Sequence, residues 1–197
     1  GDLHEDDYLF SVNDDPVLTA SQGASAFTED AGAITVNPTV TVSDADSADF
    51  GTGTLTVTIT TGGTSDDRLI IGNIGPSAGQ ISVSGSTVSY EGTQIGTFTG
   101  GTETTDLVVT LNVSADDVAA QALMRAIQYD NVSDTPSEAA RAVDMTLTDG
   151  DGGSSVASTL VSVAAVNDAP TATVQAVGAT EDTDQTITLA GTDPESD

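Results

Sequence analysis

Hydrophobic and polar residues alternate along three segments of the chain, at residues 55–59, 107–113 and 143–147. A period of two is typical of β-strands that bury one face against a core. The side chains expected to face inward are Leu55, Val57 and Ile59 in the first segment, Leu107, Val109, Leu111 and Val113 in the second, and Val143, Met145 and Leu147 in the third. We therefore predict half-buried antiparallel strands at these places.

Two other patterns predict a hairpin and a helix. Gly85-Ser86 separates the apolar runs 81–83 and 88–90, which is typical of a two-residue hairpin turn. Apolar residues at Val118, Ala122, Leu123, Ala126 and Ile127 follow helical spacing, with Ser114 as the expected N-cap and Asp117 three residues later. Many short strands with one helical connection predict an all-β protein, an antiparallel Greek-key β-sandwich with one short helical insertion.

The two ends of the chain contain a repeated sequence. Val12-Asn13-Asp14-Asp15-Pro16 recurs as Val166-Asn167-Asp168-Ala169-Pro170, 154 residues later. Two more landmarks recur in the same order: residues 28–30 (TED) at 180–182, and residues 43–47 (SDADS) at 192–196 (TDPES). The repeat predicts three parts: residues 1–16 as the end of a preceding module with its linker, 17–166 as one complete module, and 167–197 as a linker and the first strands of the next.

The charge of the chain is strongly negative. It has 31 acidic residues against three arginines and no lysine, a formal net charge of −28. Binding to nucleic acid or to an anionic membrane surface would need the opposite sign, and no apolar stretch is long enough to insert into a membrane. Disorder is an alternative for so acidic a chain, but the regular strand patterns oppose it. Cysteine is absent, so disulfides do not stabilise the chain.

The acidic residues are predicted to gather at the two ends of the sandwich. If seven strands run alternately up and down, Asn13, Asp14, Asp15, Asp44, Asp46, Asp149 and Asp151 fall at one end, and Asn167, Asp168, Glu29, Asp193 and Glu195 at the other. Carboxylates within about 5 Å of one another repel by roughly 1 to 3 kcal/mol per pair, so a bound cation is expected. Ca²⁺ prefers such oxygen ligands, whereas zinc would need His or Cys. Taken alone, the Asp-Gly and Asn-Asp segments also fit ordinary turns.

These residues resemble a known family. The V-N-D-x-P segments at 12–16 and 166–170, the D-x-D of 44–46 and the ending Thr148-Asp149-Gly150-Asp151-Gly152-Gly153 are similar to cadherin-like repeats of giant bacterial adhesins of the RTX type. The resemblance implies an immunoglobulin-like sandwich whose junctions hold calcium. The ligands that it implies are Asn13, Asp14, Glu29, Asp44, Asp46, Asp149, Asn167, Asp168, Glu181, Asp193 and Glu195.

Two features depart from that family. The module is longer than a typical cadherin repeat, chiefly in the glycine-rich stretch 62–106, and the acidic motif of one cadherin loop is missing. Asp116, Asp117, Asp130 and Asp134 are the candidates to replace it. Tyr90 and Tyr129 are expected to be core or sheet-edge residues, and His4 a solvated tail residue.

The sequence contains no catalytic motif, because it has no cysteine or lysine, one histidine, and neither a nucleophile elbow nor a phosphate loop. We therefore expect no enzymatic activity. The leading hypothesis is a calcium-binding extender module of a secreted adhesin on the bacterial cell surface, with neighbouring modules of the same chain as partners. The alternatives are a calcium-dependent module that binds carbohydrate, polymer or other cells, and a self-assembling filament or sheath subunit.

Overall fold

A computed structural model describes residues 12–195, so His4 and most of the predicted preceding module (1–16) lie outside the described residues. In the described range the chain forms strands and one helix. The strands of the sandwich are β1 (Val17–Thr19), β2 (Ser25–Thr28), β3 (Ile34–Thr35), β4 (Thr41–Ser43), β5 (Thr54–Thr61), β6 (Asp67–Ile71), β7 (Ile81–Ser84), β8 (Thr87–Tyr90), β9 (Thr93–Thr99), β10 (Leu107–Leu111), β11 (Ile127–Asn131), β12 (Arg141–Thr148) and β13 (Ser154–Ala164). The helix is α1 (Asp117–Arg125), and β14 (Thr171–Ala172) and β15 (Gly191–Thr192) follow the sandwich.

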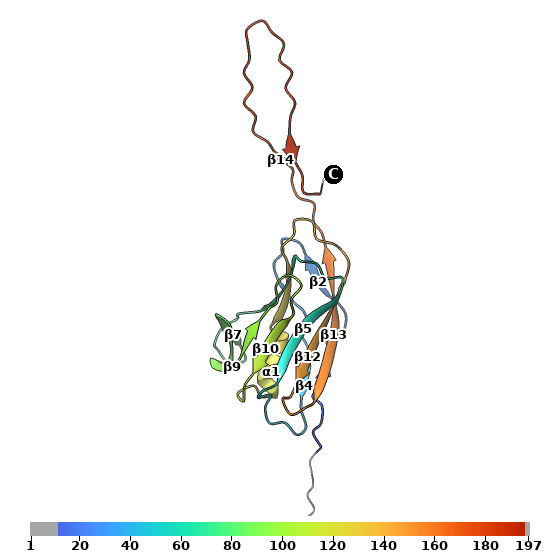
Figure 1. The fold of residues 1–197 in the computed structure, drawn as a ribbon, viewed down its shortest axis with the longest axis vertical. Helices are drawn as coiled ribbons and strands as arrows, with labels where there is room; N and C mark the ends of the chain where they lie inside the picture. Colours follow the sequence, from blue (N-terminus) through green and yellow to red (C-terminus); the bar gives the residue numbers. More distant parts are fainter. Residues whose placement is uncertain (1–11, 196–197) are drawn as a thin grey trace, which may run out of the picture.

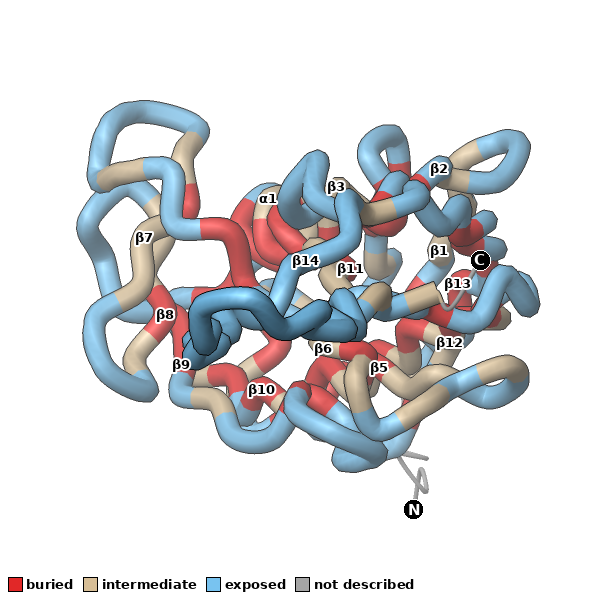
Figure 2. Tube along the Cα trace, turned by 90° about the horizontal axis from the view of Figure 1, so that it is seen from above, coloured by how far each residue is buried: buried red, intermediate tan, exposed pale blue. Residues whose placement is uncertain are grey.

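The strands form one large sheet and several small ones (Figure 1). The large sheet has the order β2-β13-β12-β5-β10-β9-β8-β7, and the small sheets are β3-β11-β6 and β1-β4. Strand pairs are antiparallel except for β2 and β13, which run parallel. Seen from above, the three-stranded sheet and α1 cover one face of the large sheet (Figure 2). The predicted all-β sandwich is therefore confirmed, although it contains more strands than the seven assumed from the sequence.

The three alternating segments form adjacent rows in the core. Strands β12, β5 and β10 are neighbours, so Val57 lies between Leu107 on one side and Met145 on the other. All three side chains are at most 1% exposed. Burial of such side chains stabilises a fold by about 1.5 to 3 kcal/mol each. Val113 departs from the prediction, because β10 ends at Leu111 and leaves Val113 76% exposed.

The helix is present but its first residue and its buried face differ from the prediction. Asp116, rather than Ser114, is the N-cap, and its carboxylate accepts a hydrogen bond of 2.8 Å from the Ala119 amide. The buried face contains Ala119, Ala120, Leu123 and Met124, whereas Val118 is 56% exposed. The expected Ser114 cap was wrong because Asp116, two residues later, is an equally favourable N-cap residue.

The glycine-rich stretch 62–106 forms ordered strands. The predicted hairpin is confirmed: β7 and β8 pair antiparallel, and Ser84 faces Thr87 across the Gly85-Ser86 turn. Gly85 has a positive φ of 58°, which a side chain at this turn position would disfavour. Strands β7, β8 and β9 extend the large sheet beyond β10 (Figure 1).

A buried ion pair crosses from β6 to β12. Arg141 Nη2 lies 3.2 Å from Asp67 Oδ1, and neither side chain is exposed. The Asp67 carboxylate also accepts hydrogen bonds from the Tyr129 hydroxyl at 2.5 Å, from the Asn131 amide at 2.7 Å and from the Thr64 backbone N–H at 2.6 Å. Burial alone would raise the pKa of Asp67, but these hydrogen bonds and that from Arg141 lower it overall. The pKa of the Tyr129 phenol is raised, first by burial and then by its hydrogen bond to Asp67.

Strands β14 and β15 repeat the pairing of β1 and β4. Val17 faces Ser43 in the first pair, and Thr171 faces Thr192 in the second, which are the residues that the sequence repeat makes equivalent. The left-handed φ of 62° at Asp30 recurs as 61° at Asp182. The C-terminal segment therefore begins with the same local structure as the segment that starts at β1.

The chain between β14 and β15 is an extended hairpin that projects away from the sandwich (Figure 1). Its apolar residues are exposed, among them Val174 at 97% and Leu189 at 90%. Two short strands without further partners are marginally stable. We expect the amides of residues 174–189 to exchange with solvent much faster than those of β12 in a dilute sample without calcium. Equal protection of the two segments in hydrogen-exchange NMR would show that the hairpin is stable by itself.

Candidate metal sites at the two ends of the sandwich

The N-terminal linker is hydrogen-bonded to two acidic loops. The side chain of Asn13 donates to Asp149 Oδ2 at 2.7 Å, and the Asp14 backbone N–H donates to both carboxylate oxygens of Asp46 at 3.2 Å. These residues were predicted to share one end of the sandwich, and the structure brings them together. The linker is therefore attached to the loop after β4 and to the loop before β13.

Asp149 organises the loop before β13. Its carboxylate is 1% exposed, and Oδ1 accepts hydrogen bonds from the backbone N–H groups of Asp151, Gly152 and Gly153 at 2.8, 3.0 and 2.9 Å. Burial tends to raise the pKa of Asp149, but the hydrogen bonds from Asn13 and these amides lower it overall. A Cβ on Gly153 would collide with Asp149 Oδ2, so only glycine allows this close approach. The Asp149 carboxylate therefore stabilises this turn by accepting hydrogen bonds from its backbone N–H groups.

The two remaining predicted ligands at this end are more peripheral. Asp15 is exposed, and its Oδ1 accepts from the Ser154 backbone N–H at 3.0 Å. Asp151 is also exposed and contacts Asp149 through its backbone N–H. Both lie in the same end region but face solvent.

The loop after β4 faces the first turn of α1. Asp44 Oδ1 accepts hydrogen bonds from the backbone N–H groups of Asp46 and Ser47 at 3.2 and 3.0 Å, and the Asp44 N–H lies 3.4 Å from Asp117 Oδ2. Three other oxygens here are buried without a hydrogen-bond partner: Asp44 Oδ2, Ser47 Oγ and Asp117 Oδ1. Buried acceptors without partners are costly, and a cation would satisfy them.

Asp117 is the residue that the sequence did not single out. It was one of four candidates for a missing ligand, and only its position on α1 places it beside Asp44. The pKa of Asp117 is raised by burial first and then by the charges of Asp44 and Asp116, although the Asp44 amide lowers it in part. Asp116 itself caps the helix, and Asp130 Oδ1 accepts from the Asn131 backbone N–H.

The C-terminal end has its own acidic cluster. Glu29, directly after β2, is 4% exposed; its Oε2 accepts from the Val166 N–H at 2.8 Å, and its Oε1 is buried without a partner. The Asp168 N–H donates to Glu195 Oε2 at 3.1 Å, while Glu195 Oε1 is also buried without a partner. The Glu195 N–H donates to Asp193 Oδ1 at 3.0 Å.

Several negative charges surround Asp168. Burial raises its pKa first, followed by the charges of Glu195, Asp30, Asp134 and Asp193. Asp134 therefore lies near this end of the module. Asn167 donates from its side chain to the Asp168 carbonyl at 3.2 Å. Glu181 is not brought to either cluster, because it is exposed in a turn between β14 and β15.

The two ends use the same contacts. Where the N-terminal linker meets its loop, the Asp14 N–H donates to Asp46 at 3.2 Å; where the C-terminal linker meets the next loop, the Asp168 N–H donates to Glu195 at 3.1 Å. Within each loop the N–H of the second acid donates to the carboxylate of the first, at 3.2 and 3.0 Å. The sequence repeat is therefore also a repeat of hydrogen bonds.

Among residues 12–195, no three or more Asp, Glu or His side chains are arranged as a ready-made metal site. The carboxylates instead accept hydrogen bonds from nearby backbone N–H groups. The chemistry of the donors nevertheless fits a hard cation, because the unpartnered buried atoms are all oxygens and five of the six lie in the two clusters, Thr159 Oγ1 being the exception. No helix among the described residues is long and apolar enough to cross a membrane.

Comparison of the chain with protein-family models, with curated proteins and with solved structures gives no match. The similarity to cadherin-like adhesin repeats therefore remains a prediction from the residues.

Asp117 provides a test of the N-terminal cluster. Without calcium, Asp117→Asn should leave stability unchanged or raise it by less than about 1 kcal/mol, because it removes repulsion from Asp44 and Asp116. With calcium, the same change should weaken binding about tenfold, because the cluster loses one ligand charge. Thermal melting with and without chelator measures both effects. Asp144→Asn, in the middle of β12, is the matched control, and identical behaviour of the two variants would remove Asp117 from the site.

Proposed function

We propose that this chain is a calcium-binding extender module of a large, repetitive adhesin on the bacterial cell surface, stiffened by calcium at its junctions with neighbouring modules. One observation carries the proposal. The linker before the sandwich binds Asp46 through the Asp14 N–H, and the linker after it binds Glu195 through the Asp168 N–H in the same way. An isolated turn would not be expected to recur at both places where the chain enters and leaves a module.

The two clusters suit calcium for reasons of charge and ligand type. Calcium binds six to eight oxygens in flexible geometry, which loops of Asp, Asn and Glu can provide. When bound, it would offset the repulsion among the carboxylates. The residues that would hold it are Asn13, Asp14, Asp44, Asp46 and Asp117 at the N-terminal end, and Glu29, Asp168, Asp193 and Glu195 at the C-terminal end. Asp149, whose carboxylate is occupied by N–H donors, would support the first group by fixing its loop.

The two ends show overlapping parts of one junction. The N-terminal end has a linker and the two acidic loops that follow it, whereas the C-terminal end has Glu29 before a linker and the first acidic loop, with Asp193 and Glu195, after it. A complete junction in an array would combine these parts, with ligands from two modules and from the linker between them. A cation shared in this way would restrict rotation of one module against the next.

The module would act outside the cell, where free calcium is high enough to fill sites of about 0.1 to 1 mM affinity. Its partners would be the neighbouring modules of the same chain, and it would have no catalytic role. A net charge of −28 would also keep the modules from associating unless calcium is present.

Small-angle scattering of a protein with two complete modules tests this function. In calcium we expect the two modules to have one extended arrangement with a single maximum dimension. In chelator we expect a smaller average dimension and a wider distribution of dimensions, because the junction becomes a hinge. An unchanged scattering profile after chelation would contradict the mechanical role. A glycan array with and without chelator separates it from direct carbohydrate binding, which predicts calcium-dependent signals for the single module.

A further inference from the structure

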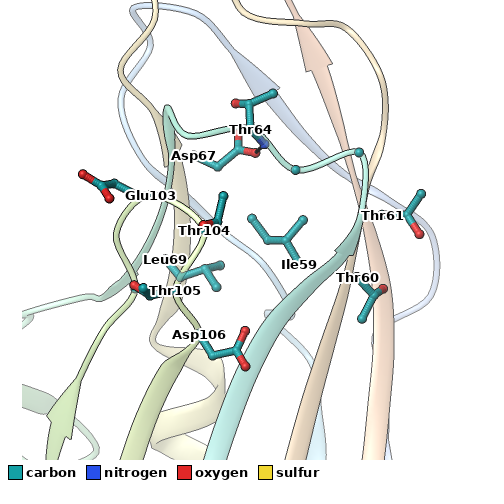
Figure 3. Close-up of a pocket in the computed structure, with 13 residues that line it drawn as sticks. Ile59, Thr60, Thr61, Thr64, Asp67, Leu69, Glu103, Thr104, Thr105 and Asp106 are labelled. Carbon is teal, nitrogen blue, oxygen red and sulfur yellow. Dashed lines mark hydrogen bonds between the residues drawn. The ribbon is translucent and has the colours of Figure 1, made fainter.

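A pocket of about 280 Å³ lies between the loop after β5 and the loop before β10 (Figure 3). Most of its lining comes from the first and last parts of the glycine-rich stretch 62–106. None of the residues proposed to bind calcium lies in that stretch. Ile59 and Leu69 lie in its middle, with Asp67 at one end and Asp106 at the other. The pocket is therefore separate from the proposed calcium sites.

The two carboxylates of the pocket differ in availability. Asp67 is already bonded to Arg141, Tyr129, Asn131 and the Thr64 N–H, so its charge is compensated within the protein. Asp106 is exposed and lies directly before β10. The Asp106 end of the pocket is therefore where an added positive charge would be most favourable.

The other lining residues define what the pocket accepts. Several are threonines, whose hydroxyls accept hydrogen bonds, and no basic or aromatic side chain is among the residues that line it, all of which the structure describes. The absence of an aromatic ring disfavours a stacked sugar, and the absence of a base disfavours an anion. An apolar middle beside a carboxylate suits a short alkyl chain that ends in a positive charge.

We propose that this pocket binds a primary alkylammonium group, such as the side chain of a lysine from another protein. The four-carbon stem would lie against Ile59 and Leu69, and the ammonium would meet Asp106 and the neighbouring hydroxyls. The pocket volume of about 280 Å³ lies at the lower limit of the roughly 300 to 1,000 Å³ of pockets for drug-sized ligands, and a single side chain fits within it. This chain contains no lysine, so its own modules do not supply the ligand. The inference goes beyond the extender role, because it gives the module a partner of its own.

An NMR titration of the full chain tests the proposal with N-acetyl-lysine methylamide as the probe. We expect a dissociation constant of about 1 mM, which suits a group of this size, with shifts confined to the residues around the pocket. The norleucine analogue, which has the same stem and no charge, should cause no comparable shifts. Asp106→Asn should weaken binding about fivefold, the effect of losing one partly exposed ion pair.

Glu138→Gln is the control. It removes the same charge from an exposed side chain that is not among the residues lining the pocket. The proposal predicts that this variant binds like the parent. Equal losses in the two variants, shifts spread over the whole acidic surface, or equal shifts with the norleucine analogue would each overturn it. Running the titration in calcium and in chelator keeps the result separate from the proposed junction sites.

Discussion

Replacing Asp67 by asparagine is expected to lower the free energy of unfolding by about 3 to 5 kcal/mol, the usual cost of removing one member of a buried ion pair. Arg141 would remain buried, with its Nε and Nη2 groups facing an amide instead of a carboxylate. The Tyr129 hydroxyl would also lose its charged acceptor. Urea unfolding at neutral pH measures this loss directly.

The neighbouring Asp66 provides the control for this prediction. Asp66→Asn makes the same change of charge one residue away, and we expect an effect within about 0.5 kcal/mol. A double replacement of Asp67 and Arg141 by apolar residues should cost less than Asp67→Asn alone, since no unpaired charge is left in the core. If Asp67→Asn and Asp66→Asn unfold at the same urea concentration, the buried pair contributes nothing to stability.

The same pair makes the parent protein sensitive to acid. The pKa of Asp67 is lowered in the folded state, so the stability it contributes is complete above the ordinary Asp pKa of about 3.9 and is lost as the pH falls below that value. Asp67→Asn should therefore have a flatter dependence of stability on pH in this acidic range.

Calcium is expected to raise the melting temperature of the chain by roughly 10 °C. Free calcium at ten times the dissociation constant stabilises each site by about 1.4 kcal/mol, so two or three sites contribute about 3 to 4 kcal/mol. For a domain of this size, each kcal/mol shifts the melting temperature by about 2 to 4 °C. Calorimetry in calcium and in chelator measures the shift.

The effect of chelation should be confined to the ends of the sandwich. The core rows of Val57, Leu107 and Met145 are buried by hydrophobic contacts that need no metal, so circular dichroism in chelator should keep its β signal at room temperature. Loss of that signal on chelation would show that the core itself depends on calcium. An unchanged melting temperature would show that calcium does not stabilise the chain.

The core was predicted well because the apolar residues of the sequence alternate with the same period of two as the side chains of a β-strand. Alternating residues on β5, β10 and β12 face one side, and pairing in register brings the three apolar rows together. The pattern failed at Val113 and Val118, which lie just after a strand and at the start of the helix. Element ends depend on caps and turns, and the apolar period says little about them.

The acidic clusters were predicted in outline and not in detail. The assumption that strands run alternately up and down placed Asn13 and Asp46 at one end and Asp168 and Glu195 at the other, as observed. The position of Asp117 depends on how α1 packs against the loop after β4, which no local pattern specifies. The Asp67–Arg141 pair was also missed. The two residues are 74 positions apart, and Asp and Arg side chains are usually exposed at the protein surface.

A calorimetric calcium titration of the chain tests the central claim most directly. The proposal predicts at least two calcium ions per chain, with dissociation constants of about 0.1 to 1 mM. Asp44→Asn should weaken the site at the N-terminal end alone, Glu29→Gln the site at the C-terminal end alone, and Asp66→Asn neither. No binding heat in the millimolar range, or the same calcium binding in all three variants as in the parent, would contradict the account.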